Sequence, residues 1–422
     1  MDMTDVVHLR GLYCGLPCAP MSLAIDRGAV SRAEGGCPVC RDQVMRAGRS
    51  PDAPRTGGRE TSLDQATAAV ARLLREARAP FLYGLARSSN ETARLAARLA
   101  ADLGAALDLE GGDALQANLL ALQTYGLPSA TFGEIRNRAD LLLFWRCDPR
   151  ATHPHLFERR AGTPLQEGGE RTFILVPVEG APGAISSEGT LPVEAGGDLA
   201  VLLAIRAFLR DRPPAAGTVG GVPRAKLMEV AERLRRASYA AILWDGAATS
   251  GALGPAVAAA LTVLARDLNL TGRGVARPLA SGNLAGAMAA LAGETGAPRA
   301  CGFRRGGPAR FGPAEFGAER FIADGRADLC LLIGAGAFPA ASNGAGKTRR
   351  PRTIVVGPRL PEGLPQADVL IPTALPGLSA AGAGRRADGL PVVLRAPLPS
   401  VRPSEEMVLE TLRAALLGGA ES

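Results

Sequence analysis

Short apolar runs alternate with amphipathic stretches along most of this 422-residue chain. The helical period first appears after Thr61, where apolar residues at spacings of three and four follow Ser62, a residue type that caps helices. Pro80 ends that helix, residues 81–85 (FLYGL) form a short apolar run typical of a buried strand, and an amphipathic stretch follows over about residues 89–103. This alternation predicts a parallel sheet covered by helices.

The same alternation continues downstream. Further strands are expected at residues 139–145, 172–176, 240–244, 327–333 and 353–356. Further helices are expected over residues 199–210 and 254–268. Strands that are apolar throughout are typical of sheets buried on both faces. The sequence therefore predicts an α/β fold with Rossmann-type parallel sheets flanked by helices, and it lacks the short repeat of a solenoid.

Composition and charge narrow the classes of function. Hydrophobic residues make up 47% of the chain, enough for a large core in roughly two or three domains. The net charge is +7, but the positive residues are dispersed and only 4% of residues are aromatic, which disfavours a nucleic-acid groove. The first residues do not resemble a signal peptide, and no long apolar stretch predicts a membrane span. We expect a cytoplasmic protein with no nucleic-acid or membrane partner.

Four cysteines gather near the start of the chain. Cys14 and Cys18 form a C-x3-C pair, and Cys37 and Cys40 form a C-x2-C pair after a spacer of 18 residues. Short spacings let two thiolates from one turn reach one ion, and four thiolates close a tetrahedral site. We therefore predict a metal site at Cys14, Cys18, Cys37 and Cys40, in a head too small to fold on its own core. The spacing suits zinc and a [4Fe–4S] cluster alike, and four reduced structural thiols are the remaining alternative.

Other residues carry weaker signals of chemistry. Cys330 lies inside an apolar run and is predicted to be a core residue, whereas Cys301 has no evident partner. Cys147 follows a predicted strand, where ligands gather in α/β sheets, and His153 and His155 lie close by in sequence. Because Pro154 separates the two histidines and no carboxylates accompany them, a structural loop is favoured over a metal or catalytic site.

Two glycine-rich segments resemble phosphate loops without completing the motif. Residues 343–348 (NGAGKT) lack the first glycine of a Walker motif, since Ala341 holds its position. Gly334 and Gly336 follow a predicted strand, but Pro339 stands where a dinucleotide motif has its third glycine. Both segments are predicted to be ordinary loops that let the chain turn.

Three separated blocks resemble a known family. The blocks are residues 131–149 (TFGEIRNRADLLLFWRCDP), 281–298 (SGNLAGAMAALAGETGAP) and 367–395 (ADVLIPTALPGLSAAGAGRRADGLPVVLR). They are similar, in the same order, to the GE-x-x-NRAD, GN-x-x-GA…TG-x-P and AD-x-x-IP…G-x-E-x-x-G-x-x-x-R-x-D patterns of the formylmethanofuran dehydrogenase B-type subunits. The resemblance spans nearly the whole chain. It implies the molybdopterin-oxidoreductase fold, in which an N-terminal [4Fe–4S] module precedes two interleaved α/β domains that hold a tungsten or molybdenum pterin.

The chain departs from that family at both metal sites. The family binds tungsten or molybdenum through a cysteine or selenocysteine, but the corresponding residues 106–118 (ALDLEGGDALQAN) contain no cysteine. The family's cluster motif places its first ligand at Gly11, which cannot coordinate, and Cys40 is the available replacement. We therefore expect zinc at the four-cysteine site, with [4Fe–4S] as the alternative, and no tungsten or molybdenum pterin.

The third block is weakened as well. Ser379 stands where the family has its acidic residue, although Gly382, Arg386 and Asp388 remain. Asp388, beside Arg385 and Arg386, is predicted to be either a relict anion site or a solvated turn.

With these combined losses, the chain resembles the B-type subunit of the formyltransferase/hydrolase complex of methylotrophic bacteria. The resemblance implies a non-catalytic structural subunit in one-carbon metabolism and formaldehyde oxidation, with no catalytic residue of its own. Its partners would be an amidohydrolase-like hydrolase, a formyltransferase and a C subunit. The complex would transfer a formyl group from formyl-tetrahydromethanopterin to a methanofuran-type carrier and release formate.

Two alternatives and a domain layout complete the sequence expectations. An active tungsten or molybdenum dehydrogenase subunit with a [4Fe–4S] cluster would need a ligand such as Asp108, Asp113 or Cys147, and a stand-alone zinc-headed binding protein is the third possibility. By analogy with the fold, we expect a metal module and linker at residues 1–59, a discontinuous α/β domain at residues 60–107 and 236–422, and an inserted α/β domain at residues 108–235.

Overall fold

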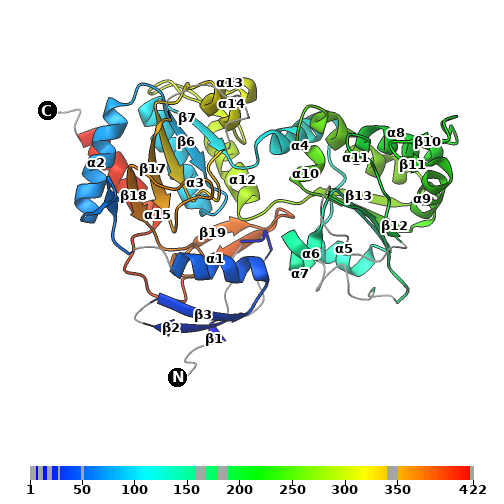
Figure 1. The fold of residues 1–422 in the computed structure, drawn as a ribbon, viewed down its shortest axis with the longest axis horizontal. Coiled ribbons are helices and arrows are strands. Elements are labelled where there is room, and N and C mark those ends of the chain that lie inside the picture. Colours follow the sequence, from blue (N-terminus) through cyan, green and yellow to red (C-terminus); the bar gives the residue numbers. More distant parts are fainter. Residues whose placement is uncertain are drawn as a thin grey trace. The chain divides into compact units, whose positions relative to one another are not determined.

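Two compact units make up the chain. The computed structural model describes residues 6–7, 13–16, 21–26, 29–48, 52–156, 165, 168–178, 189–339 and 350–418. Unit 1 comprises Met1–Gly112 with Ser281–Ser422, and unit 2 comprises Asp113–Ala280. Each unit has its own parallel sheet with helices packed against it (Figure 1). The α/β architecture expected from the sequence is confirmed.

The second junction between the units differs from the expected one. Residues 236–280 belong with the middle segment, whereas the sequence analysis assigned them to the outer domain. The cause is strand pairing, because β12 (Tyr239–Trp244) pairs in parallel with β8 (Leu141–Trp145) of unit 2. Two apolar strands of similar length look alike in sequence, and nothing local specifies which sheet each one joins.

In the described part of unit 1, nine strands form one sheet. In spatial order they are β15 (Arg310–Phe311), β14 (Cys301–Gly302), β7 (Ala106–Leu109), β6 (Pro80–Gly84), β16 (Leu329–Ile333), β17 (Arg352–Gly357), β18 (Val369–Pro372), β4 (Arg55–Thr56) and β5 (Arg59–Glu60). The run from β7 to β18 is parallel. Its chain order is 2-1-3-4-5, so the order reverses between β6 and β16.

Helices cover both faces of this sheet, which explains why its central strands are apolar throughout. The helices of one face are α2 (Leu63–Glu76), α15 (Glu405–Gly418), α3 (Asn90–Leu103) and α12 (Leu284–Thr295), which pack in that lateral order. On the other face, α13 (Pro313–Phe316) and α14 (Ala318–Ala323) bury Phe316 and Phe321 against Phe81 and Leu332 of the strands. Ser62 begins α2 with a capping box completed by Gln65, as its position predicted.

The cysteine-bearing head and a late hairpin complete unit 1. The head contains the antiparallel strands β1 (Val6–Val7), β2 (Met21–Asp26) and β3 (Ala29–Gly35), followed by α1 (Pro38–Gly48). The hairpin consists of β19 (Gly382–Arg385) and β20 (Pro391–Leu394), and β19 packs against α3 and α12. The third family-like block therefore folds across β18 and this hairpin.

Unit 2 repeats the same topology on a smaller scale. Its parallel sheet has the order β13 (Arg273–Pro278), β12, β8 and β9 (Thr172–Val176), so the chain order again reverses next to the first strand, β8. Its other elements are α4 (Gly112–Tyr125), α5 (Phe132–Arg138), α6 (Pro149–Thr152), α7 (Pro154–Leu156), α8 (Asp198–Leu209), α9 (Arg224–Arg236), α10 (Gly246–Thr249), α11 (Gly254–Leu268), β10 (Thr218–Val219) and β11 (Val222–Pro223). Residues of α8, α9 and α11 form one buried cluster with the strands. Figure 1 shows the labelled helices of this unit beside its sheet.

Candidate functional site

Three of the four head cysteines meet at one point. Cys14, Cys37 and Cys40 are all buried, and their sulfur atoms lie within 4.8 Å of one another. The Sγ atoms of Cys14 and Cys40 are 3.9 Å apart. Cys18 lies outside the described residues, so its role as the fourth ligand stays a prediction.

The local fold explains this convergence. Gly15 has a φ of 74°, a left-handed conformation that suits glycine and turns the chain immediately after Cys14. Cys37 precedes α1 and Cys40 lies in its first turn, where the Cys40 N–H donates to Cys37 Sγ at 3.3 Å. Two thiols from a helix start and one from a tight turn therefore face a single point.

The electrostatics of the cluster suit a cation. A hydrogen bond to Cys37, together with burial, raises the pKa of the Cys14 thiol to about 12. Such thiols stay protonated at neutral pH unless a metal ion displaces their protons. Buried, mutually adjacent thiols are therefore a fitting donor set for a thiophilic metal ion, and these side chains would hold it.

Hydrogen bonds on both sides of Cys14 attach the head to the rest of unit 1. The Tyr13 hydroxyl donates to the Pro376 carbonyl at 2.8 Å, and the Gly15 carbonyl accepts the N–H of Ala387 at 2.8 Å. Both partners belong to the segment that carries the third family-like block. The position of Cys14 is thus set partly by residues more than 300 positions away in the chain.

The turn of the β19–β20 hairpin contains an internal ion pair. The Asp388 side chain is fully buried and ion-paired with Arg386, with Nε to Oδ1 at 2.8 Å. Arg385 instead donates to the Gly389 carbonyl at 3.1 Å. The expectation of a solvated turn is therefore wrong for Asp388, whose internal ion pair holds the turn that contacts Gly15, whereas the relict anion site stays a prediction.

The segment that corresponds to the family's tungsten or molybdenum ligand holds an internal ion pair. Asp108 in β7 is fully buried, and Arg299 contacts it through Nε at 2.9 Å and Nη2 at 2.5 Å. The backbone N–H groups of Leu109, Ala300 and Ala318 also donate to its two oxygens. With these five hydrogen bonds, the Asp108 carboxylate has little capacity left for a metal ion.

The other alternative ligands also fit a metal poorly. Asp113 is exposed at the start of α4. Cys147 is buried in unit 2, where burial, together with the nearby Asp245 carboxylate, raises the pKa of its thiol well above the ordinary range. Among the described residues, the head cysteines are the group whose spacing suits metal binding.

The two histidines and the two remaining cysteines that the sequence singled out are all buried. His153 and His155 are buried, and His153 contacts Thr152 Oγ1 at 2.9 Å and the Ala280 carbonyl at 3.3 Å, as expected of a structural segment. Cys330 is fully buried in β16, which confirms it as a core residue. Cys301 lies in β14 and contacts Thr295.

The glycine-rich segments have different outcomes. Gly334 has a φ of 50° at the end of β16 and turns the chain, as predicted. Residues 343–348 lie outside the described residues.

Comparison with known proteins now identifies the family. No protein-family model matches the chain. The B-type subunit of the formyltransferase/hydrolase complex Fhc of Methylorubrum extorquens is 32% identical over 333 residues, covering 77% of this chain and 86% of the relative. The chain belongs to this B-type family. The B-type subunit of tungsten-containing formylmethanofuran dehydrogenase 2 of Methanocaldococcus jannaschii is 26% identical over 421 residues, covering 94% of this chain and 95% of the relative.

Two solved structures agree with this assignment. The crystal structure of the formyltransferase/hydrolase complex (FhcABCD) of M. extorquens with methylofuran contains a chain that matches with a TM-score of 0.71 at 29% identity, covering 88% of this chain and all of that one. Acetylene hydratase of Pelobacter acetylenicus matches with a TM-score of 0.66 at 12% identity, covering 97% of this chain and 69% of that one. The second likeness concerns the fold alone, and the predicted molybdopterin-oxidoreductase-type fold is confirmed. Within the described part of this member of the B-type family, every helix is too short or too polar to span a bilayer.

Sequence reasoning missed one group of polar residues in unit 1. Glu405 and Glu406, at the start of α15, reach Ser88, Ser89 and Thr92 at the start of α3. More than 300 residues separate the two helices, and no motif marks the pair of acids. The one local signal was the serine pair after β6, in a position typical of ligand-binding loops.

Proposed function

We propose that this chain is a structural, non-catalytic subunit of a formyltransferase/hydrolase complex. The observation that carries the proposal is the state of residues 106–118, where the family's metal ligand belongs. The segment has no cysteine, and its buried acid, Asp108, is fully engaged by Arg299 and backbone N–H groups. A subunit that cannot hold the redox metal through this segment has no means of oxidising or reducing a one-carbon unit there.

The partners of the proposed subunit follow from the relatives. Fhc of M. extorquens is the multi-subunit complex FhcABCD, which was solved with methylofuran. In this interpretation, an amidohydrolase-like hydrolase and a formyltransferase carry out the chemistry, and this chain contacts them together with a C subunit. The formyl group would pass from formyl-tetrahydromethanopterin to a methanofuran-type carrier and leave as formate in the cytoplasm.

We further propose that the head binds zinc through Cys14, Cys18, Cys37 and Cys40. The three described thiols support a tetrahedral thiolate site, and zinc needs no electron-transfer partner. A [4Fe–4S] cluster uses the same donors, but it would have no redox centre to serve in this chain. When bound, zinc would supply structural cross-linking of the head and no chemistry on the substrate.

Co-purification and elemental analysis test this function together. The chain, carrying an affinity tag, is expressed with the transferase, the hydrolase and the C subunit of its own genome. We expect all of them to co-purify, with one zinc per copy of this chain and no tungsten or molybdenum. Stoichiometric tungsten or molybdenum together with formate oxidation would establish the dehydrogenase instead, and isolation of this chain alone would favour the stand-alone binder.

A cysteine variant separates a structural metal from a catalytic one. Replacing both Cys14 and Cys37 by Ser is expected to remove the metal and to weaken assembly, while the intrinsic activity of the isolated hydrolase is unchanged. Cys301→Ala serves as a matched control, since that thiol is also buried but lies outside the head. Loss of assembly in the control would show that the effect is not specific to the metal site.

A further inference from the structure

The start of α3 in unit 1 stands where an α/β sheet usually binds an anionic ligand. The strand order reverses between β6 and β16, and ligands of open parallel sheets bind beyond the carboxyl ends of strands at such a point. The helix that follows the first strand presents its N-terminus there and favours a phosphate group. In this chain, residues 85–89 lead from β6 into α3.

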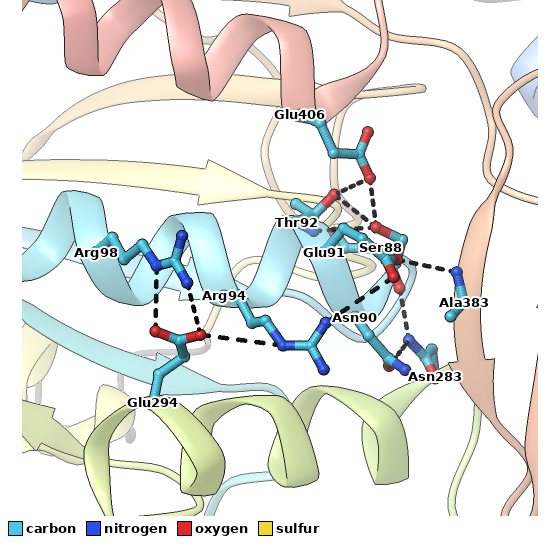
Figure 2. A network of polar contacts seen from close by, with 11 residues as sticks. Ser88, Asn90, Glu91, Thr92, Arg94, Arg98, Asn283, Glu294, Ala383 and Glu406 are labelled. Carbon is cyan, nitrogen blue, oxygen red and sulfur yellow. Dashed lines mark hydrogen bonds and ion pairs between the residues drawn. The ribbon is translucent and has the colours of Figure 1, made fainter.

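A carboxylate of the protein itself occupies this position. Glu406 in the first turn of α15 accepts a hydrogen bond from the Thr92 hydroxyl at 2.7 Å (Figure 2). It accepts a second hydrogen bond from the Ser89 hydroxyl. Ser89 in turn caps α3 by accepting the Thr92 N–H at 3.0 Å. The two hydroxyls at the helix start are therefore engaged by an anion from a distant helix.

A second carboxyl group points into the same crevice. Glu405 is 1% exposed, and the polar groups beside its carboxylate are the hydroxyls of Ser88 and Thr92, which lie outside normal hydrogen-bond geometry. The Ser88 hydroxyl is also buried. A Cβ atom added to Gly334, at the end of β16, would lie 2.1 Å from Ser88 Oγ and 3.0 Å from Glu405 Oε1. Glu405 and Ser88 therefore meet above the gap between β6 and β16.

At the end of the neighbouring strand β7, another acidic residue is also contacted by groups of the protein itself. Glu110 follows β7, where a dinucleotide-binding fold places the acid that contacts the ribose. Here its carboxylate accepts the N–H of Gly336, and the Arg87 guanidinium lies where a Cβ of Gly336 would be. Arg87 and Arg359 both favour the charged form of Glu110, although burial outweighs them and raises its pKa. The polar groups of this sheet edge are thus directed at the protein's own carboxylates.

We propose that α15 acts as a built-in substitute for a ligand, with Glu406 in the place of a phosphate group and Glu405 filling the crevice beside it. The residues present therefore do not fit a phosphate-bearing cofactor in unit 1 unless α15 moves. This inference rests on the geometry of unit 1 and does not depend on the scaffold role. It assigns the α3 start as a latent site for a small oxyanion such as a phosphate ester.

An entrance to the latent site already exists. A cavity of about 350 Å³ is lined by Glu406 together with Ser379, Ser400 and Ser404. Glu91 also lines it and contributes negative charge, but one of its oxygens is engaged by the Ala383 N–H at 2.9 Å (Figure 2). Because Glu406 lines this cavity and also contacts the Ser89 and Thr92 hydroxyls, removal of its carboxylate would open the cavity toward them.

Phosphate binding by full-length variants tests the proposal. Wild type, Glu406→Ala and Glu406→Gln are titrated with inorganic phosphate at constant ionic strength, and binding is followed by calorimetry and by the shift in Tm. We expect Glu406→Ala to lower Tm and to bind phosphate at least tenfold more tightly than wild type, with phosphate restoring part of the lost Tm. Glu406→Gln, which keeps a hydrogen-bonding side chain, is expected to fold stably and show a smaller gain.

A matched control on α15 tests whether the gain in phosphate binding is specific to Glu406. Glu410→Ala removes an exposed carboxylate from the same helix and is expected to leave phosphate binding unchanged. A merely structural contact predicts a loss of Tm in Glu406→Ala that phosphate does not restore, and this result would overturn the proposal. Phosphate binding by wild type that equals the binding by Glu406→Ala would overturn it as well.

Discussion

Replacing Glu405 by Gln is expected to stabilise the protein at neutral pH and to flatten its stability profile above about pH 5. Burial, reinforced by the neighbouring carboxylate of Glu406, raises the pKa of Glu405 from its ordinary value of 4.5 to about 8. The groups that face it are Ser88 and Thr92, which are uncharged and oppose the change only in part. A neutral amide of nearly the same shape would not need to be desolvated as an ion.

The sign follows from proton linkage. A carboxyl group whose pKa is raised on folding binds its proton more tightly in the folded chain, so its contribution to stability is fully present below the unfolded pKa. That contribution is lost as the pH rises from 4.5 through about 8. The difference between these values, at about 1.4 kcal/mol per pH unit, sets a ceiling of about 5 kcal/mol above pH 8. At pH 7 the corresponding figure is about 3 kcal/mol.

Urea unfolding of the full chain at several pH values measures this effect. The free energy of unfolding of Glu405→Gln should exceed that of wild type by about 2–3 kcal/mol at pH 7 and differ by less than about 1 kcal/mol at pH 5. Glu410→Gln, an exposed change on the same helix, should behave as wild type at both values. A difference between Glu405→Gln and wild type that is constant with pH would refute the reasoning, because only a titrating buried carboxyl group predicts growth with pH.

Two further changes test the architecture. Arg299→Met should lower the free energy of unfolding by about 3–5 kcal/mol in a denaturant titration, because it leaves the Asp108 carboxylate buried without its cation. The control Arg304→Met changes an exposed residue and should have little effect. An equal loss of stability in both variants would argue against the ion pair. If the head binds zinc as proposed, Tyr13→Phe should accelerate its release about fivefold in a chromogenic chelator assay, since it removes the hydrogen bond to the Pro376 carbonyl, worth about 1 kcal/mol. Tyr125→Phe alters an exposed tyrosine of unit 2, and zinc release as fast as in Tyr13→Phe would contradict the positioning role.

Local pattern predicted six of the nine strands in the parallel sheets of the described residues, β6, β8, β9, β12, β16 and β17, but it missed β7, β13 and β18. The strand at residues 172–176 and the helix at residues 254–268 have the expected bounds, because apolar periodicity and flanking glycines mark them locally. The capping role of Ser62 was equally readable from sequence. The assignment of residues 236–280 failed, since the choice of sheet depends on long-range pairing between β12 and β8 that no local signal encodes.

In the candidate site, too, local features were predictable from the sequence and long-range contacts were not. Cysteine spacing predicted the convergence of Cys14, Cys37 and Cys40, because short spacings constrain geometry directly. The partners that position Cys14 come from residues 376 and 387, and the partner of Asp108 is Arg299. Such contacts join segments hundreds of residues apart, so their chemistry is visible in the sequence while their pairing is not.

The internal use of acids in unit 1 gives a physical reason why a scaffold can keep an enzyme fold. A crevice evolved for an anionic cofactor contains polar groups, and each one left buried without a partner costs about 1–3 kcal/mol. Glu406 meets this requirement for the hydroxyls of Ser89 and Thr92, and Arg299 with Asp108 removes the corresponding charges at β7. Once such internal partners are in place, return of a phosphate-bearing cofactor requires displacement of α15 as well as a new metal ligand. Under the proposed scaffold role, the same internal contacts that exclude a cofactor would also make the domain rigid, as a structural subunit requires.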